Sequence, residues 1–195
     1  MVKIRIIVAS TRPERKGPAV GSWIYEIAAK RYGTEVKVID LAAIELPFLD
    51  EPKHPRLKDY SMEHTKKWSI MIDEADAFII VTPEYNFGYP APLKNALDFL
   101  YQEWNNKPVA FVSYGGIAGG TRAVQQLKQV VTAQKMFPVL EAVHIPFFTK
   151  YMDANGKFNG DQTLARSAED MLTELIRLAN MFLVMRQEER SRITA

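Results

Sequence analysis

A short loop between Thr82 and Pro92 combines aromatic, amide and carboxylate side chains with a restricted backbone. It reads Thr-Pro-Glu-Tyr-Asn-Phe-Gly-Tyr-Pro-Ala-Pro and therefore holds three prolines, two tyrosines and a glycine. Prolines stiffen the backbone and the aromatic rings supply flat walls, which suits a planar ligand held by main-chain groups. The alternative is a rigid surface turn whose tyrosines pack on the core, since such loops also occur at sheet edges that bind nothing.

The elements on either side place this loop at the carboxyl end of a strand. The apolar run Ala77–Val81 precedes it and is typical of a buried strand. Pro92 can open the following helix, which we expect to continue to about Trp104, because proline at the first helical position loses no needed donor. Ligands of open parallel sheets bind outside the carboxyl ends of the strands, so the loop lies where a binding site is expected.

The rest of the chain alternates strand-like and helix-like periods in one domain spanning residues 1–195. Most strands are apolar throughout, which predicts an α/β fold: a five-stranded parallel sheet with helices on both faces. The other expected strands are Lys3–Ala9, Glu35–Asp40, Val109–Val112 and Ala142–Ile145. Four other helices are expected: one beginning near Ala19, one capped by Ser61, one bearing Val124 to Val131, and one from about Thr163 to Gln187.

The loop after the first strand has the composition of an anion site. It reads Ser10-Thr11-Arg12-Pro13-Glu14-Arg15-Lys16-Gly17-Pro18 and leads into the helix near Ala19. Hydroxyls, free backbone amides, guanidinium groups and the positive end of a helix dipole suit a terminal phosphate. No Gly-x-Gly-x-x-Gly or Gly-Lys-Ser/Thr pattern is present, which disfavours a pyrophosphate or triphosphate. The alternative is a solvated surface loop with ordinary charges.

The loop after the fourth strand is rich in glycine. It reads Ser113-Tyr114-Gly115-Gly116-Ile117-Ala118-Gly119-Gly120. Glycines let the backbone approach a ligand closely, and Tyr114 could border it. A flexible turn would have the same composition, so this loop alone is weak evidence for a site.

Composition excludes several classes of function. The chain has no cysteine, so thiol redox chemistry and cysteine-held metal clusters are excluded. The net charge of +2, from 25 Lys and Arg against 23 Asp and Glu, does not indicate a nucleic-acid partner. The three histidines lack metal-ligand spacing, and no Gly-x-Ser-x-Gly motif of a hydrolase is present. We expect a cytoplasmic protein without a metal, a membrane segment or a nucleic-acid partner.

Taken together, these motifs resemble the NAD(P)H-dependent FMN reductase family of flavodoxin-like proteins. The resemblance rests on Ser10-Thr11-Arg12, on Pro83-Glu84-Tyr85-Asn86 with Leu93-Lys94-Asn95-Ala96 behind it, and on the glycine pair after the fourth strand. It covers nearly the whole chain. It implies a three-layer flavodoxin-like fold with strand order 2-1-3-4-5, FMN as cofactor, and NADPH or NADH as electron donor.

The resemblance also implies roles for individual residues. Ser10, Thr11, Arg12 and the amides of Ala19 and Val20 would hold the FMN phosphate, with Arg15 as a second cation. The flavin ring would be lined, mainly through backbone donors near its N5 and O4 atoms, by Pro83, Glu84, Tyr85 and Asn86. Its pyrimidine side would be closed by Ser113, Tyr114, Gly115 and Gly116. No acid or base side chain is required, because hydride passes directly to flavin N5.

Two classes of function remain open on this resemblance. The first is an enzyme that takes hydride from NAD(P)H and reduces flavins, quinones or similar small acceptors by a ping-pong mechanism. The second is a flavodoxin-type electron carrier, or a flavin-bound regulatory protein, without NAD(P)H turnover of its own. Near-neutral charge disfavours the carrier, since carriers that dock on basic partners generally have acidic surfaces.

The helix after Pro92 also predicts assembly. Leu93, Ala96, Leu97, Leu100 and Trp104 form one apolar stripe, which leaves Phe99 and Tyr101 on another face. We expect that second face to pack against another subunit, and the resemblance implies a homodimer or a homotetramer.

Overall fold

A parallel sheet forms the middle layer of the protein in the computed structural model, which describes residues 1–193 and side chains as far as residue 188. Its strand order is β2-β1-β3-β4-β5, with β6 also paired to β4, and every pairing is parallel. The predicted order 2-1-3-4-5 is therefore confirmed. The strands are β1 (Val2–Val8), β2 (Thr34–Asp40), β3 (Ala77–Pro83), β4 (Pro108–Tyr114), β5 (Phe137–Pro138) and β6 (Val143–Ile145).

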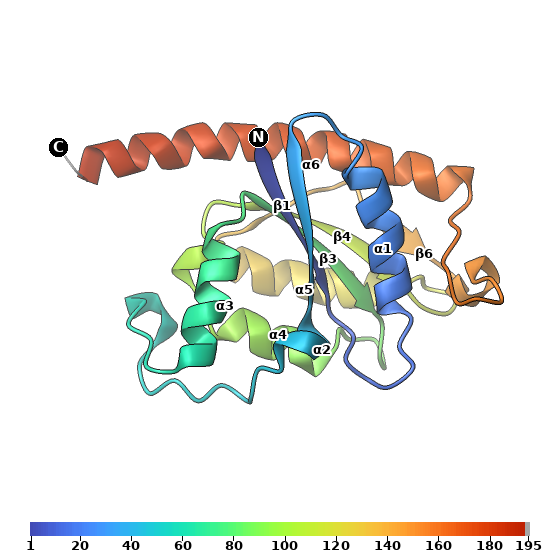
Figure 1. Ribbon diagram of the computed structural model, residues 1–195, viewed down its shortest axis with the longest axis horizontal. Helices are drawn as coiled ribbons and strands as arrows, with labels where there is room; N and C mark the ends of the chain where they lie inside the picture. Colours follow the sequence, from blue (N-terminus) through green and yellow to red (C-terminus); the bar gives the residue numbers. More distant parts are fainter. Residues whose placement is uncertain (194–195) are drawn as a thin grey trace.

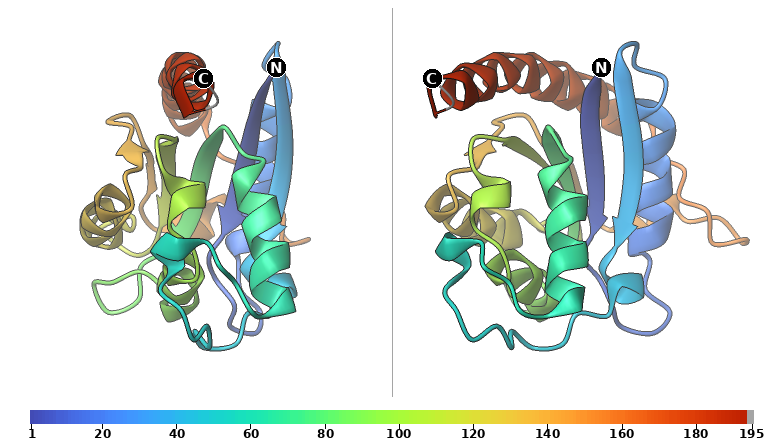
Figure 2. Two further views of the ribbon diagram at one scale, coloured as in Figure 1. Left: turned by 90° about the vertical axis from the view of Figure 1, so that its left-hand side faces the viewer. Right: turned by 60° about the vertical axis from the view of Figure 1, so that its left-hand side comes forward.

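Helices cover both faces of this sheet (Figures 1 and 2). One face packs against α1 (Gly17–Ala28) and α6 (Gln162–Ile193). The other packs against α3 (Glu63–Asp73), α4 (Ala91–Asp98) and α5 (Thr121–Ala133). Because β3 and β4 are buried along their whole length, their apolar sequences are explained by this double cover. The short elements are α2 (Leu41–Ile44), η1 (Pro55–Leu57), η2 (Gln102–Trp104) and η3 (Phe148–Tyr151).

The fifth position of the sheet is filled by two short strands instead of one. The sequence predicted a single strand at Ala142–Ile145, whereas β5 pairs with Pro108 and Val109 and β6 pairs with the other end of β4. Pro138 has no backbone N–H and so cannot donate a hydrogen bond to a neighbouring strand, which limits the length of β5. Leu140, between the two strands, is 83% exposed, so the chain leaves the sheet there.

The helix after Pro92 ends earlier than expected. It was predicted to reach Trp104, but α4 stops at Asp98, and the chain turns before the separate helix η2. The turn carries Phe99 into the core, where its side chain is completely buried beside Leu97 and Leu100. The prediction that Phe99 lies on a second, subunit-facing side of this helix is therefore wrong.

The start of α3 is capped from a distance. Ser61 was expected to cap this helix, but the N-cap is Met62, which has no side-chain cap. The Glu51 carboxylate instead accepts hydrogen bonds from the backbone N–H groups of Ser61 and Met62, at 2.8 and 2.9 Å. A carboxylate at a helix N-terminus also matches the helix dipole. The prediction failed because the cap comes from a residue outside the helix's own sequence.

The final helix, α6, is the long helix along the top of Figure 1, and its last turns extend beyond the rest of the molecule. Leu172 and Leu175 face the sheet and are fully buried. Charged residues recur along its length. No helix within residues 1–193 combines the length and apolar character needed to cross a bilayer.

Candidate functional site

Three loops meet at the carboxyl ends of β1, β3 and β4, as the strand order requires. The backbone N–H of Ala9 donates to Val81 O at 2.9 Å, which joins the end of β1 to β3. Glu84 N–H donates to Tyr114 O at 3.2 Å, which joins the end of β3 to β4. The structure therefore brings the three predicted loops to one edge of the sheet.

The first loop, Ser10–Pro18, presents backbone donors with no partner. Pro13 and Pro18 have no N–H. Several of the other N–H groups make no backbone hydrogen bond in the described part of the chain: those of Thr11, Arg12, Glu14, Lys16, Gly17 and Ala19. The loop ends at the N-terminus of α1, whose N-cap residue Lys16 provides no side-chain cap. Val20 differs, because its N–H donates to Lys16 O at 3.3 Å. Unpaired donors at the positive end of a helix dipole form an anion site.

Ser10 and Tyr114 connect the first loop to the third. The Ser10 hydroxyl is fully buried and makes no hydrogen bond of ordinary geometry with a described residue. Gly17 packs against both side chains: a Cβ there would lie 2.2 Å from Ser10 Oγ and 3.0 Å from the Tyr114 hydroxyl. Burial raises the pKa of Tyr114 to about 12, against the opposing influence of Ser10 and Arg15. Tyr114 therefore remains a neutral hydrogen-bonding group at physiological pH.

The two arginines of the first loop have different surroundings. Arg15 forms a bidentate ion pair with Asp40 at the end of β2, at 2.7 and 2.6 Å, and also donates to Ser10 O at 3.0 Å. Arg12 is exposed and makes no ion pair with a described residue. Arg12 is thus available to a ligand, whereas Arg15 fixes the shape of the loop.

The second loop contains a tight turn from Tyr85 to Gly88. Tyr85 N–H donates to Gly88 O at 2.8 Å, and Gly88 N–H donates to Tyr85 O at 2.9 Å. The two central residues, Asn86 and Phe87, have φ of 50° and 71°, as in a type I′ turn. Their own N–H groups have no acceptor among the described residues. Tyr85 is 36% exposed and Phe87 is 59% exposed, so the turn presents both free donors and aromatic surface.

The third loop is held internally by Ser113. Its buried hydroxyl donates to Gly119 O at 2.8 Å and lies 2.7 Å from His144 Nδ1. Gly115 N–H donates to Ile145 O at 3.2 Å, and Gly116 O accepts from Phe147 N–H at 3.1 Å. Ser113 therefore supports the loop from inside, while Gly116 lies on its exposed side.

Two residues outside the predicted set also contact the second loop. Arg122 forms an ion pair with Glu84 at 2.9 Å and lies over the Phe87 ring, 4.3 Å from its centroid. Gln126 donates to Phe87 O at 3.2 Å. Sequence analysis missed both because they lie on α5, where a polar residue at helical spacing has the pattern of any solvated helix face. The available signal was their spacing of four residues at the start of the helix that follows Gly119-Gly120.

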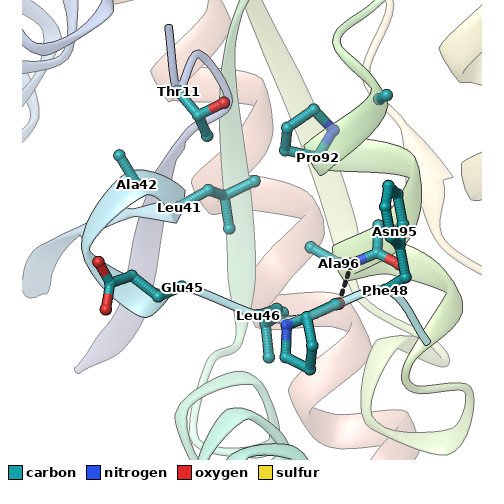
Figure 3. Close-up of a pocket in the computed structure, with 11 residues that line it drawn as sticks. Thr11, Leu41, Ala42, Glu45, Leu46, Phe48, Pro92, Asn95 and Ala96 are labelled. Atoms are coloured by element: carbon teal, nitrogen blue, oxygen red, sulfur yellow. Dashed lines mark hydrogen bonds between the residues drawn. The ribbon is translucent and has the colours of Figure 1, made fainter. Parts of the chain in front are cut away.

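A largely apolar cavity of about 460 Å³ lies beside this edge (Figure 3). Thr11 lines it, and no other residue of the predicted site does. Its walls are α2 with the segment that follows, and the first turns of α4. The Asn95 side chain joins these walls by donating to Pro47 O at 2.7 Å and accepting from Leu49 N–H at 3.0 Å. The cavity therefore borders the first loop at Thr11 and does not include the second or third loop.

A parallel sheet of order 2-1-3-4-5, covered by helices on both faces, defines a flavodoxin-like protein. Residues 2–150 match the sequence pattern of the NADPH-dependent FMN reductase family. An NAD(P)H-dependent FMN reductase from Schizosaccharomyces pombe is 44% identical over 148 residues, which is 74% of each chain. The chain belongs to this family.

The chain is also similar to a plant quinone oxidoreductase in sequence and to a bacterial flavoenzyme in structure. An NAD(P)H:quinone oxidoreductase from Solanum tuberosum is 29% identical over 163 residues, covering 79% of this chain and 77% of that protein. Among solved structures, the flavoenzyme NAD(P)H:(acceptor) oxidoreductase FerB from Paracoccus denitrificans superposes with a TM-score of 0.73. It is 21% identical, and the match covers 93% of this chain and 99% of that one. The structural match confirms the flavodoxin-like fold.

Proposed function

We propose that this protein binds FMN at the three-loop edge and uses it to pass electrons from NADPH or NADH to small acceptors such as flavins or quinones, in the cytoplasm. The observation that carries the proposal is the first loop, whose unpaired N–H groups from Thr11 to Ala19 meet the N-terminus of α1. Membership of the FMN reductase family and the quinone reductase relative support it. A ping-pong cycle follows if donor and acceptor use the same open face in turn.

In this proposal the first loop holds the phosphate. The free amides, the Thr11 hydroxyl and the exposed Arg12 guanidinium supply donors and positive charge. The buried Ser10 hydroxyl fits the same role, because it makes no hydrogen bond of ordinary geometry and, beyond its contact with Tyr114, can still hydrogen-bond to a ligand. Arg15 contributes through its pair with Asp40, which holds the loop against the end of β2. The Ala19 N–H is free to donate to the phosphate. The Val20 N–H already donates to Lys16 O, so Val20 contributes only as part of the first turn of α1.

The second and third loops hold the ring. Pro83 and Glu84 fix the start of the Tyr85–Gly88 turn, and Asn86 and Phe87 direct free N–H groups outward. Tyr114, Gly115 and Gly116 form the opposite border, with Ser113 supporting them from inside. FMN held here would supply the redox chemistry. The chain contributes a rigid platform and oriented donors where negative charge develops, and it supplies no acid or base.

An anaerobic absorbance spectrum tests this function directly. The purified protein should be yellow and should release FMN, not FAD, because the first loop suits a single terminal phosphate. Added NADPH or NADH should bleach the flavin band within seconds, and a quinone should restore it. A flavin that neither nucleotide bleaches would identify a carrier or regulatory protein, and a colourless protein that binds no FMN would refute the proposal.

Arg12→Ala should weaken FMN binding by about 1.5–3 kcal/mol, the cost of a charged hydrogen bond, without changing thermal stability. The reason is that Arg12 is exposed and has no protein partner that its loss would leave unpaired. Titration of apoprotein with FMN, followed by flavin fluorescence, measures this loss. Lys30→Ala, at an exposed position beyond the other end of α1, is the matched control. Equal FMN affinities of Arg12→Ala and wild type would show that Arg12 does not contact the phosphate.

We also propose that the protein forms a homodimer or homotetramer. The exposed apolar surface that supports this lies on the segment between α2 and α3, where Phe48 is 89%, Leu49 44% and Leu57 65% exposed. Asn95 of α4 anchors this segment, so the surface lies next to the helix originally expected to form the interface. Light scattering that shows only monomer at micromolar concentration would contradict this assembly.

A further inference from the structure

We propose that Glu84 is a positioning residue: its carboxylate caps helix α5 from outside the helix and, through Arg122, holds the Tyr85–Gly88 turn in a ligand-ready shape. This inference rests on the proposed function only in taking the flavin ring as the ligand. The clamp, defined as Glu84, Arg122, Gln126 and Phe87, is a property of the protein alone.

Helix α5 cannot be capped by its own N-cap residue. That residue is Gly120, which has no side chain and lies at a φ of 84°. A Cβ at this position would lie 2.7 Å from Ser113 Cβ and 2.9 Å from Tyr114 N, so no serine, threonine or aspartate cap fits. The Thr121 N–H donates to Ala118 O at 3.0 Å. The N–H of the next residue, Arg122, needs an acceptor from elsewhere in the fold.

Glu84 supplies that acceptor with both carboxylate oxygens. Oε2 accepts from the backbone N–H of Arg122 at 3.1 Å, and Oε1 accepts from the Arg122 guanidinium at 2.9 Å. The Glu84 side chain is only 10% exposed, whereas that of Arg122 is 47% exposed. A largely buried carboxylate at a helix N-terminus is stabilised by the dipole and by hydrogen bonding together.

The same helix also holds the turn that follows Glu84. The Arg122 guanidinium covers one face of Phe87, and one helical turn later Gln126 donates to Phe87 O. A phenylalanine at a φ of 71° is a strained conformation that persists only where its surroundings impose it. The contacts from Arg122 and Gln126 are those surroundings.

This clamp fixes the two free donors of the turn before a ligand arrives. Asn86 and Phe87 have no acceptors for their N–H groups among the described residues, and both lie at the exposed edge of the site. Donors that are already oriented stabilise charge on a ring without reorganising at the moment of reaction. Glu84 therefore affects the ligand through the turn.

Amide hydrogen exchange on the apoprotein tests the clamp without any flavin. In Glu84→Ala, the N–H groups of Tyr85, Gly88 and Arg122 should exchange at least about tenfold faster than in wild type, because their bonds depend on the clamp. Glu84→Gln keeps an oxygen for the helix cap but loses the charge, so its exchange should be intermediate. Arg177→Ala removes an ion pair on the exposed side of α6 and should leave these amides unchanged. Unchanged exchange in Glu84→Ala would overturn the inference.

The loaded protein gives an independent readout. Glu84→Ala should bind FMN roughly ten- to a hundredfold more weakly and lower the midpoint potential of the bound flavin, with partial rescue in Glu84→Gln. Wild-type affinity and potential in Glu84→Ala would refute the positioning role while leaving the FMN reductase proposal intact. Failure of wild type to bind FMN would refute that proposal, and the exchange experiment would still decide whether the clamp exists.

Discussion

Phe99→Asp is expected to unfold the protein at ordinary temperature instead of producing a folded monomer. The Phe99 side chain has no exposed surface and packs in the cluster beneath α3 and α4. The substitution removes a buried aromatic ring, at a cost of about 3–5 kcal/mol, and places an unpaired carboxylate in the cavity. The loss of the ring and the burial of the charge together approach the free energy of unfolding of a typical domain, about 5–15 kcal/mol.

Circular dichroism and thermal denaturation measure this effect. Phe48→Asp is the matched control, because Phe48 is 89% exposed and the same charge there should keep the fold. In light scattering, Phe48→Asp should instead shift the protein toward monomer if the surface between α2 and α3 is the interface. A folded Phe99→Asp protein with a wild-type melting temperature would contradict the burial of this residue.

The error over Phe99 shows what helical spacing cannot reveal. The apolar residues after Pro92 predicted one long helix with two apolar faces. The helix ends at Asp98. The ring centroid of Trp104 then lies 4.9 Å from that of Phe78 and 6.0 Å from that of Trp68. Those contacts come from residues far away in sequence, so the extra apolar face indicated a bend into the core and not a subunit contact.

Gly120→Ala should destabilise the protein by about 2–4 kcal/mol and abolish FMN binding at micromolar flavin. Alanine at a φ of 84° costs about 1–2 kcal/mol, and its Cβ would collide with Ser113 Cβ at 2.7 Å. Relief of that collision must move the third loop or the start of α5. Both movements disturb the site, because Ser113 supports that loop and Glu84 binds the helix.

Urea denaturation and FMN titration measure the two effects of Gly120→Ala. Gly116→Ala serves as the stability control, since a Cβ at Gly116 meets nothing within 4 Å. Equal unfolding midpoints for the Gly120 and Gly116 variants would show that the left-handed conformation at Gly120 is not required.

The architecture was predictable because it depends on patterns that are local along the chain. Buried parallel strands appear as continuous apolar runs, and the alternation of these runs with helical periods determines the sheet and its two covers. The strand at Ala142–Ile145 was placed within one residue of β6. The companion strand β5 contains only two residues, too few for any pattern to indicate it.

The candidate site was also predictable in part: its loops were identified from the sequence, but the pairings of their side chains were not. The loops at residues 10–18, 83–89 and 113–120 were identified from composition and from their positions after strands. Which side chains point outward depends on partners from other elements, such as Asp40 for Arg15 and His144 for Ser113. Such pairings follow from the fold and have no signature in the sequence near either residue.

The pair between Arg15 and Asp40 has a thermodynamic consequence for the first loop, Ser10–Pro18. Its two short hydrogen bonds, together with the bond from Arg15 to Ser10 O, hold the loop against the end of β2 when no ligand is present. A loop that is already ordered loses little conformational entropy on binding, so more of the contact energy contributes to affinity. By the same reasoning, a ligand that leaves this loop need not unfold it, so exchange of one ligand molecule for another does not require loss of the native structure.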